Sequence, residues 1–390
     1  MRSRSRRWAI AIALTGFAGA AVAVLSGGAA AAASSGAAAA NRAAPSSDPF
    51  LSQLTSTRVL APTAPKSGPA KGDVNPYGVA VVKRTSGKLT QGDVLVSNFN
   101  DAANHQGTGS SIVEISPSGK ARVFAVVPHP TATRATGLTT ALVALRSGFV
   151  IVGSLPAPGG NSSAAKAGAL TIVNPQGHVV ANYTAPDING PWDMTALDQG
   201  ATATLFVTNV LNGTVAAKGK VVARGTVVRL ALRIPGGGAP QVVSNQVIAT
   251  GFAEHTDPNA LVVGPTGVGL APSGTLYVAD SDKSRIAAIP NAMTRTSSMG
   301  GGGQTVTKGG SLNDPLGLAI APNGDVLTMN GGNGKIVETT PGGKQAKSKT
   351  LVPNGAGDLF GLAVAPNGRG VYFVNDIGSG KAANSLDLLH

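Results

Sequence analysis

Short apolar runs separated by Pro-x-Gly turns recur along the second half of the chain. In GLAIAPNGDVLTMNGGNGKIVETTPGG, residues 318–320 form a short apolar strand, and residues 326–329 and 335–339 form two further strands. Turns lie at 322–324 and 341–343, and the stretch KTLVP makes a fourth strand. Proline presets φ at the second position of a turn, and glycine accepts the positive φ that ends it. The pattern therefore predicts a meander of four short antiparallel strands.

The same unit recurs along the chain. The Pro-Asn-Gly turn returns at 366–368, and IVEISPSGK near residue 112 nearly repeats IVETTPGGK near residue 336. Meanders repeated at this length cannot bury their own faces, and they stack radially around an axis. We therefore expect an all-β, six-bladed β-propeller of four-stranded antiparallel blades, whose units open near Gly78, Gly137, Trp192, Gly267, Gly317 and Gly361.

The last unit is one strand short. The stretch STRVLAPT, ahead of the first unit, is similar to fourth strands such as ARVFAVVP. We expect residues 56–62 to complete the last blade, because a ring closed by both ends of the chain removes a sheet edge.

The stretch PTGVGLAPSGTLYVADSDKSRIAAI resembles an NHL repeat, with an opening P-x-G, a Pro-x-Gly turn, a strand that ends in VAD and an RI pair. NPYGVAVV and NDPLGLAIAPNGDVLTMN are similar to its first half. The resemblance implies a six-bladed propeller that is distantly similar to the gluconolactonase type. It does not imply one activity, because such propellers include binding platforms, lactone hydrolases and lyases.

The N-terminus has the pattern of an export signal. A basic start is followed by the apolar stretch WAIAIALTGFAGAAVAVL and a small-residue region with A-x-A sites. We expect a signal peptide at 1–33, a flexible linker at 34–49, a propeller at 50–390 and a periplasmic or extracellular location. A permanent membrane anchor is the alternative, but the run is short and rich in Ala and Gly. The sequence has no cysteine, which excludes disulfides and a cysteine-linked lipid.

The formal charge is +13, from 31 Lys and Arg against 18 Asp and Glu. These cations are scattered along the chain and have no aromatic residues between them, whereas nucleic-acid binding requires a clustered basic patch. We therefore expect a solvated basic surface and no nucleic-acid partner. We also expect no membrane span after signal removal, and a monomer.

Propeller topology places the Pro-x-Gly turns on one face and the longer connections on the other. FNDAANHQGTGS, LPAPGGNSSAAKAG, LNGTVAAKGKVVAR and GFAEHTDPNALVVGP all belong to the second face, which we call the looped face; the first is the turn face. Binding residues usually lie on loops held by a rigid scaffold, so we expect the site on the looped face.

His255 and Asp257, in AEHTDPN, are the candidate catalytic residues on that face, beside Glu254; His105 and His129 map to the same face. A histidine next to carboxylates can bind a metal or act as a general base. In the alternative interpretation, Asp257 only caps the turn before Pro258.

A second candidate set is the polar residue that ends each second strand: Asn98, Ser154, Asn209, Asp280, Asn330 and Asn375. A ring of oxygen ligands suits calcium. In the alternative, these side chains anchor the following loops, and Asp280 pairs with Arg285 across a hairpin.

The gluconolactonase resemblance implies Glu, Asn and Asp metal ligands just ahead of the opening glycines. Only NGPW, with Asn189, keeps a likeness to such a site; the other positions carry Tyr77, Thr136, Thr266, Leu316 and Phe360. The missing carboxylates argue against a metal-dependent lactonase, and we expect no metal site and no cofactor other than calcium in the ring described above.

Three aromatic residues stand at these positions, which surround the mouth of the central channel of a propeller: Tyr77, Trp192 and Phe360. They form either a platform for a sugar ring or an apolar ligand, or a plug in which they pack on each other. The first functional hypothesis is a binding module for a small ligand, glycan or protein on the looped face. The alternative is a hydrolase or lyase with its site at the channel mouth.

Overall fold

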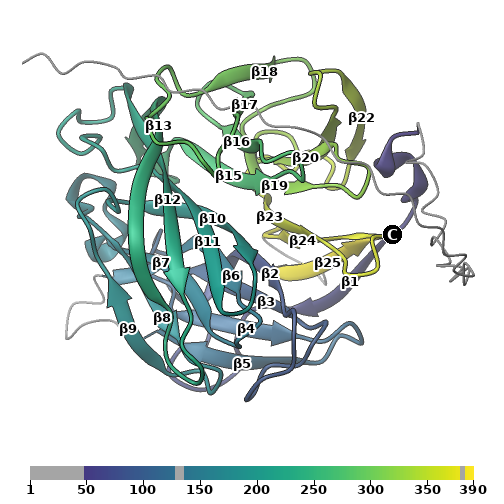
Figure 1. Ribbon diagram of the computed structural model, residues 1–390. Coiled ribbons are helices and arrows are strands. Elements are labelled where there is room, and N and C mark those ends of the chain that lie inside the picture. Colours follow the sequence, from purple (N-terminus) through teal and green to yellow (C-terminus); the bar gives the residue numbers. More distant parts are fainter. Residues whose placement is uncertain (1–47, 128–135, 378–382) are drawn as a thin grey trace, which may run out of the picture. The chain divides into compact units, whose positions relative to one another are not determined.

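The computed structural model describes residues 48–127, 136–377 and 383–390. Within these residues the strands form six sheets, arranged side by side around a common axis (Figure 1). The expected six-bladed β-propeller is confirmed. The export segment and linker, apart from residues 48 and 49, lie outside the described residues, as does His129.

The strands run from the axis outward in chain order in blades 1 to 5, and in blade 6 the first strand of the chain, β1 (Thr57–Pro62), is outermost. Blades 1 to 3 are β2 (Val74–Val81), β3 (Val94–Asn100), β4 (Ser111–Ile115), β5 (Ala121–Val126); β6 (Thr136–Ala144), β7 (Val150–Pro156), β8 (Ala169–Val173), β9 (Val179–Tyr183); and β10 (Pro191–Asp198), β11 (Thr202–Asn209), β12 (Val222–Arg233), β13 (Gln241–Asp257), β14 (Leu261–Val263). Blades 4 to 6 are β15 (Pro265–Leu270), β16 (Leu276–Asp280), β17 (Arg285–Ile289), β18 (Gln304–Lys308); β19 (Pro315–Ile320), β20 (Val326–Asn330), β21 (Lys335–Thr339), β22 (Gln345–Thr350); and β23 (Leu359–Val364), β24 (Val371–Asn375), β25 (Ser385–Leu389), β1 (Thr57–Pro62). Short 3₁₀ helices are η1 (Phe50–Gln53), η2 (Pro158–Gly160) and η3 (Ser162–Ala164).

The N-terminal strand closes the ring as expected. β1 pairs antiparallel with β25, from Thr57 opposite Leu389 to Pro62 opposite Ser385, with a register shift between Val59 and Ala61. The last blade therefore contains strands from both ends of the propeller (Figure 1).

Blade 3 differs from the expected four strands. β13 continues to Asp257 and turns back into β14, which pairs His255 with Val263 and Asp257 with Leu261. The stretch GFAEHTDPNALVVGP, expected as a loop, is therefore largely a hairpin.

The opening glycines lie where neighbouring innermost strands approach most closely. A Cβ added to Gly317 would lie 2.3 Å from the carbonyl oxygen of Phe360, and one on Gly361 would lie 2.1 Å from that of Tyr77. Because real Cβ atoms cannot approach so closely, glycine is required there.

Strand register corrects the expected openings of blades 2 and 3. Pro191 pairs with Asn209 as Pro265 pairs with Asp280, so Asp193, not Trp192, takes the place of Gly267. In blade 2, three residues lie between Leu138, which pairs with Ser154, and Leu142, which pairs with Val152. Only two residues lie between the corresponding positions of blade 1, Pro76 and Val79. Thr140, rather than Gly137, consequently lies at the constriction.

The core lies between the blades. The second strands β16, β20 and β24 are buried along their whole length, whereas every position of the outermost strands β9 and β22 is half-buried or exposed. Each second strand packs on neighbouring sheets through both faces, which explains its nearly continuous apolar sequence.

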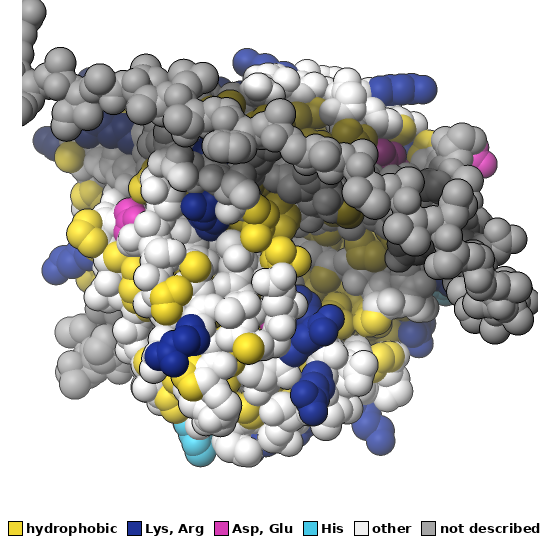
Figure 2. Space-filling view, in the orientation of Figure 1, with side chains coloured by type: hydrophobic (Ala, Val, Ile, Leu, Met, Phe, Trp, Pro, Cys, Tyr) yellow, Lys and Arg dark blue, Asp and Glu magenta, His cyan; other side chains and the backbone are white. Residues whose placement is uncertain are grey.

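Lys and Arg side chains are spread over the visible face and do not gather in one patch (Figure 2). Among the described residues, no helix has the length and hydrophobicity needed to cross a bilayer.

Candidate functional site

A cavity of about 300 Å³ opens at the mouth of the channel on the looped face. Its walls come from the starts of innermost strands and from loops of several blades. The described residues that line it are Asn75, Tyr77, Phe99, Asn104, Gln106, Asn259, Ala260, Val262, Val263, Thr266, Asp314, Leu316, Gly331, Gly357, Phe360 and Asp376. We call it the looped-face cavity.

Aromatic side chains form one wall of this cavity. The ring centroids of Tyr77 and Phe360 lie 4.3 Å apart, and those of Tyr77 and Phe99 lie 5.4 Å apart. Burial raises the pKa of the Tyr77 phenol, so this residue stays neutral. The rings pack on each other, as in the plug arrangement, and they also line the cavity; their role as a platform for a ligand stays a prediction.

Trp192 supports this aromatic wall from behind. Its ring meets that of Phe99 edge-on, at a centroid distance of 5.6 Å and an angle of 80°. It is 1% exposed and is not among the described residues that line the looped-face cavity.

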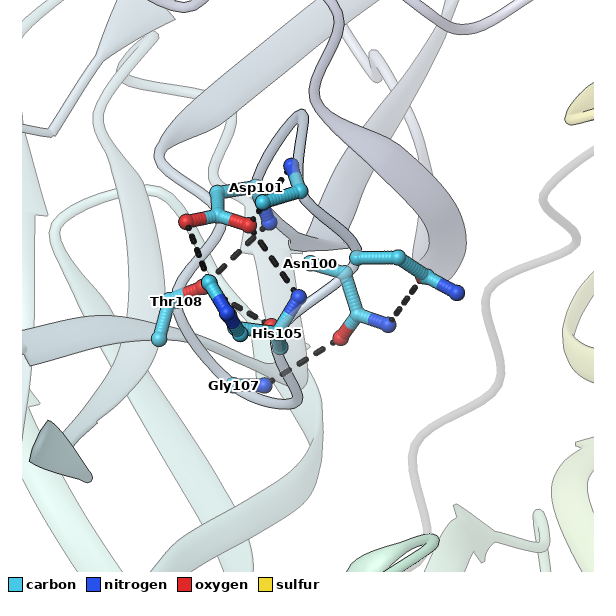
Figure 3. A network of polar contacts seen from close by, with 7 residues as sticks. Asn100, Asp101, His105, Gly107 and Thr108 are labelled. Atoms are coloured by element: carbon cyan, nitrogen blue, oxygen red, sulfur yellow. Dashed lines mark hydrogen bonds and ion pairs between the residues drawn. The ribbon is translucent and has the colours of Figure 1, made fainter. Parts of the chain in front are cut away.

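The β3–β4 loop places Asn104 and Gln106 at the cavity mouth. Inside this loop, Asp101 accepts hydrogen bonds from the backbone N–H groups of Ala103 at 3.0 Å and His105 at 3.1 Å, and its second oxygen lies 3.2 Å from His105 Nδ1 (Figure 3). Asn100 also accepts from the Gly107 N–H and donates to the Asn104 side chain (Figure 3). The loop is thus held in one conformation by its own side chains.

Two carboxyl groups, Asp314 and Asp376, complete the cavity. Burial raises the pKa of Asp376 to about 7, and the neighbouring Asp358 charge adds to the rise. Burial also raises the pKa of Asp314, with a smaller contribution from the Asp282 carboxylate. Near neutral pH, Asp376 is therefore present in both protonation states, and its carboxyl group can donate as well as accept a hydrogen bond.

His255 lies on β13 between two carboxylates. Its Nδ1 is 2.8 Å from Asp282 Oδ2, and its Nε2 is 4.0 Å from Asp257 Oδ2. Asp257 also accepts the Asn259 N–H at 2.6 Å, so it caps the β13–β14 turn as in the alternative interpretation. The structure brings the candidate pair together and adds Asp282, which the sequence analysis missed. Glu254 is fully buried and accepts the Asn212 N–H at 3.0 Å.

The six strand-end residues are all buried. Asn98 donates to the Thr63 carbonyl at 2.9 Å, Asn330 donates to that of Ser311 at 2.7 Å, and Asp280 accepts from Arg285 Nε at 2.6 Å. None of the six lines the looped-face cavity within the described part of the chain. As ligand-binding residues, Asn98, Asn209, Asp280, Asn330 and Asn375 stay a prediction. Across the described ranges, no group of three or more His, Asp or Glu side chains is placed to hold a metal ion.

Asp193 is a further functional candidate that the sequence analysis missed. It stands at a constriction of about 20 Å³ that is also lined by Gly78, Gly267, Gly317 and Gly361. Its Oδ1 accepts the Met194 N–H at 2.7 Å, and burial raises its pKa to about 8. Aligning the blades on the P-x-G opening, with PWD in place of PTG or PLG, would have identified it.

No family model and no curated protein matches the sequence. Three solved structures share the fold. A gluconolactonase from Xanthomonas campestris has 14% identity over 86% of this chain and 89% of its own, with a TM-score of 0.52. The calcium-binding protein regucalcin from Agrobacterium tumefaciens has 14% identity over 86% and 93%, with a TM-score of 0.51. A PQQ-bound aldose sugar dehydrogenase from Streptomyces coelicolor has 16% identity over 85% and 97%, also with a TM-score of 0.51. The chain is thus similar in fold to gluconolactonase-type and related propellers.

Proposed function

We propose that this chain is an exported binding module that holds a sugar ring or a similar small polar ring in the looped-face cavity. The observation that carries the proposal is the combination of Tyr77 and Phe360 with amide and carboxyl side chains around one cavity of about 300 Å³.

This combination suits a carbohydrate for a physical reason. The C–H faces of a sugar ring pack on aromatic side chains, while its hydroxyl groups exchange hydrogen bonds with groups that donate and accept. Gln106 and Asn259 supply amides at the mouth, and Asp314 and Asp376 supply carboxyl groups. The cavity size falls in the range of small-molecule sites.

Calorimetric titration with D-glucose, N-acetyl-D-glucosamine and cellobiose tests the proposal. We expect at least one of them to bind, and Gln106→Ala and Asp376→Asn each to weaken that binding by roughly fivefold to tenfold through loss of a hydrogen bond. Gln176→Ala is the matched control, because Gln176 is an exposed residue of a turn on the other face. Absence of binding by all three sugars, or equal weakening in the control, would reject the sugar-binding proposal.

The hydrolase alternative is favoured by one observation, the 2.8 Å contact between His255 Nδ1 and Asp282. A carboxylate at Nδ1 orients the imidazole so that Nε2 can accept a proton from water. Release of acid from D-glucono-1,5-lactone, lost in His255→Gln and retained in His178→Gln, would support a hydrolase. His178 is the control because it is an exposed residue beside the β8–β9 turn, on the turn face. Rates equal to those without protein would exclude this lactone as a substrate.

A further inference from the structure

A second and larger cavity, of about 900 Å³, opens on the turn face. It is lined by residues of all six innermost strands, and its mouth lies beside the β2–β3, β6–β7 and β23–β24 turns. We call it the turn-face cavity. It is separate from the looped-face cavity: no residue lines both.

The walls of the turn-face cavity are mostly aliphatic. Val81, Leu270, Ile320 and Val364 line it and are only half-buried, because their side chains face the open channel rather than a neighbouring sheet. Apolar surface gathered in a concave site of this size is typical of a binding site for an apolar ligand.

Two cations stand at one side of the mouth. Lys83 and Arg146 both line the cavity and are both exposed. Among the described residues, neither side chain forms an ion pair. The nearby Asp198 carboxylate accepts the backbone N–H groups of Arg146 at 2.5 Å and Gly200 at 2.9 Å. Burial lowers the pKa of Lys83, and the Asp198 carboxylate partly offsets this fall by favouring the charged ammonium.

We propose that the turn-face cavity binds an anionic amphiphile, with the aliphatic chain inside the channel and the carboxylate or similar anion at Lys83 and Arg146. The aliphatic walls and the two cations are complementary to the two halves of such a molecule. The excess of Lys and Arg over Asp and Glu, which is +13 with the export segment included, favours approach of an anion. This site goes beyond the proposed function, since it lies on the opposite face.

Asp193 at the floor of the cavity fits this ligand as well. A charged carboxylate at the floor would disfavour binding of an aliphatic chain end, because contact with the chain would remove water from the charge. Because burial raises the pKa of Asp193 to about 8, most of it is protonated at neutral pH, and the floor carries little charge.

The experiment is calorimetric titration of the full chain with dodecanoate below its micellar concentration, beside dodecyltrimethylammonium at the same concentration. We expect dodecanoate to bind with a stoichiometry of about one and the cationic amphiphile to bind at least tenfold more weakly. The double variant Lys83→Ala/Arg146→Ala should lose about tenfold in dodecanoate affinity.

Two variants make the test specific. Arg84→Ala removes a cation from the neighbouring position, which does not line the cavity, and should change affinity less than twofold. Ala196→Phe places a ring inside the cavity and should abolish binding in a protein whose circular dichroism is unchanged. If Ala196→Phe fails to fold, Ala319→Phe, at another lining position, replaces it. Equal affinity for the two amphiphiles, no binding of dodecanoate, or full binding by the folded cavity-filling variant would each overturn the proposal.

Discussion

The carboxylate of Glu338 in blade 5 accepts a hydrogen bond from the backbone N–H of Phe50, 2.7 Å away and 288 positions earlier in the chain. Its second oxygen accepts the Leu51 N–H at 2.8 Å. Glu338 is fully buried, so this carboxylate fixes η1 to the ring without competition from water.

Removing this carboxylate should destabilise the propeller. Glu338→Ala leaves two backbone N–H groups without their acceptor, and we expect the free energy of unfolding to fall by about 2–3 kcal/mol. Glu338→Gln keeps one oxygen acceptor and should lose less. Urea unfolding measures both, and an unchanged midpoint for Glu338→Ala would show that η1 does not contribute to stability.

Strand β1 offers a matched pair of substitutions that tests ring closure. Ala61 is 3% exposed and pairs with Leu386, whereas Val59 on the same strand is 40% exposed. Burying an unpaired carboxylate is costly, so Ala61→Asp should lower the free energy of unfolding by roughly 3 kcal/mol or more, and Val59→Asp by less than about 0.5 kcal/mol. Calorimetric melting curves that coincide for the two variants would contradict the closure role of β1.

The opening glycines should not tolerate a methyl group. Gly317→Ala would bring Cβ to 2.3 Å from the Phe360 carbonyl oxygen, and we expect a loss of about 1–3 kcal/mol from the forced shift of neighbouring strands. Gly236→Ala is the control, because nothing lies within 4 Å of its added Cβ. Chemical unfolding of the two variants side by side gives the answer; equal stability would mean that the neighbouring blade can move at no cost.

Stability should fall as the pH rises toward 8. Burial raises the pKa of Glu254 from 4.5 to about 8. The folded protein therefore binds this proton more tightly than the unfolded chain, and the resulting stabilisation is complete below about pH 4.5 and lost as pH rises through about 8. Asp193 and Asp376, raised to about 8 and about 7 by burial, act in the same direction.

Glu254→Gln isolates one of these groups. The amide keeps an acceptor for the Asn212 N–H but does not titrate. The drop in unfolding free energy between about pH 5 and about pH 9 should be smaller in the variant than in the parent. Parallel stability curves from urea unfolding across this range would exclude a titrating Glu254.

The blades and the closing strand could be predicted from the sequence because their signals are local. Pro-x-Gly turns such as 322–324 fix hairpins within a few residues, and the number of repeated units predicts the number of blades. The hairpin of β13 and β14 escaped because the turn at Asp257 interrupts a stretch that has no copy in the other blades.

The site was less accessible to sequence reasoning. Asp282 contacts His255 from a different blade, and the separation of the two residues in the sequence does not predict this contact. Asp314 and Asp376 enter the looped-face cavity from connections between and within other blades. Asp193 escaped prediction for another reason: an opening glycine marks the start of most blades, and this blade has an aspartate at that place.

The ends of the propeller also meet outside their shared sheet. The carbonyl oxygen of His390 accepts the N–H groups of Thr55 and Ser56, each at 2.9 Å. Because the two ends lie together, the chain could begin at a tight turn elsewhere in the ring without loss of a strand pairing. A circularly permuted chain that joins residue 390 to residue 48 through a short glycine linker, and begins instead at Gly274, should fold into the same β-propeller.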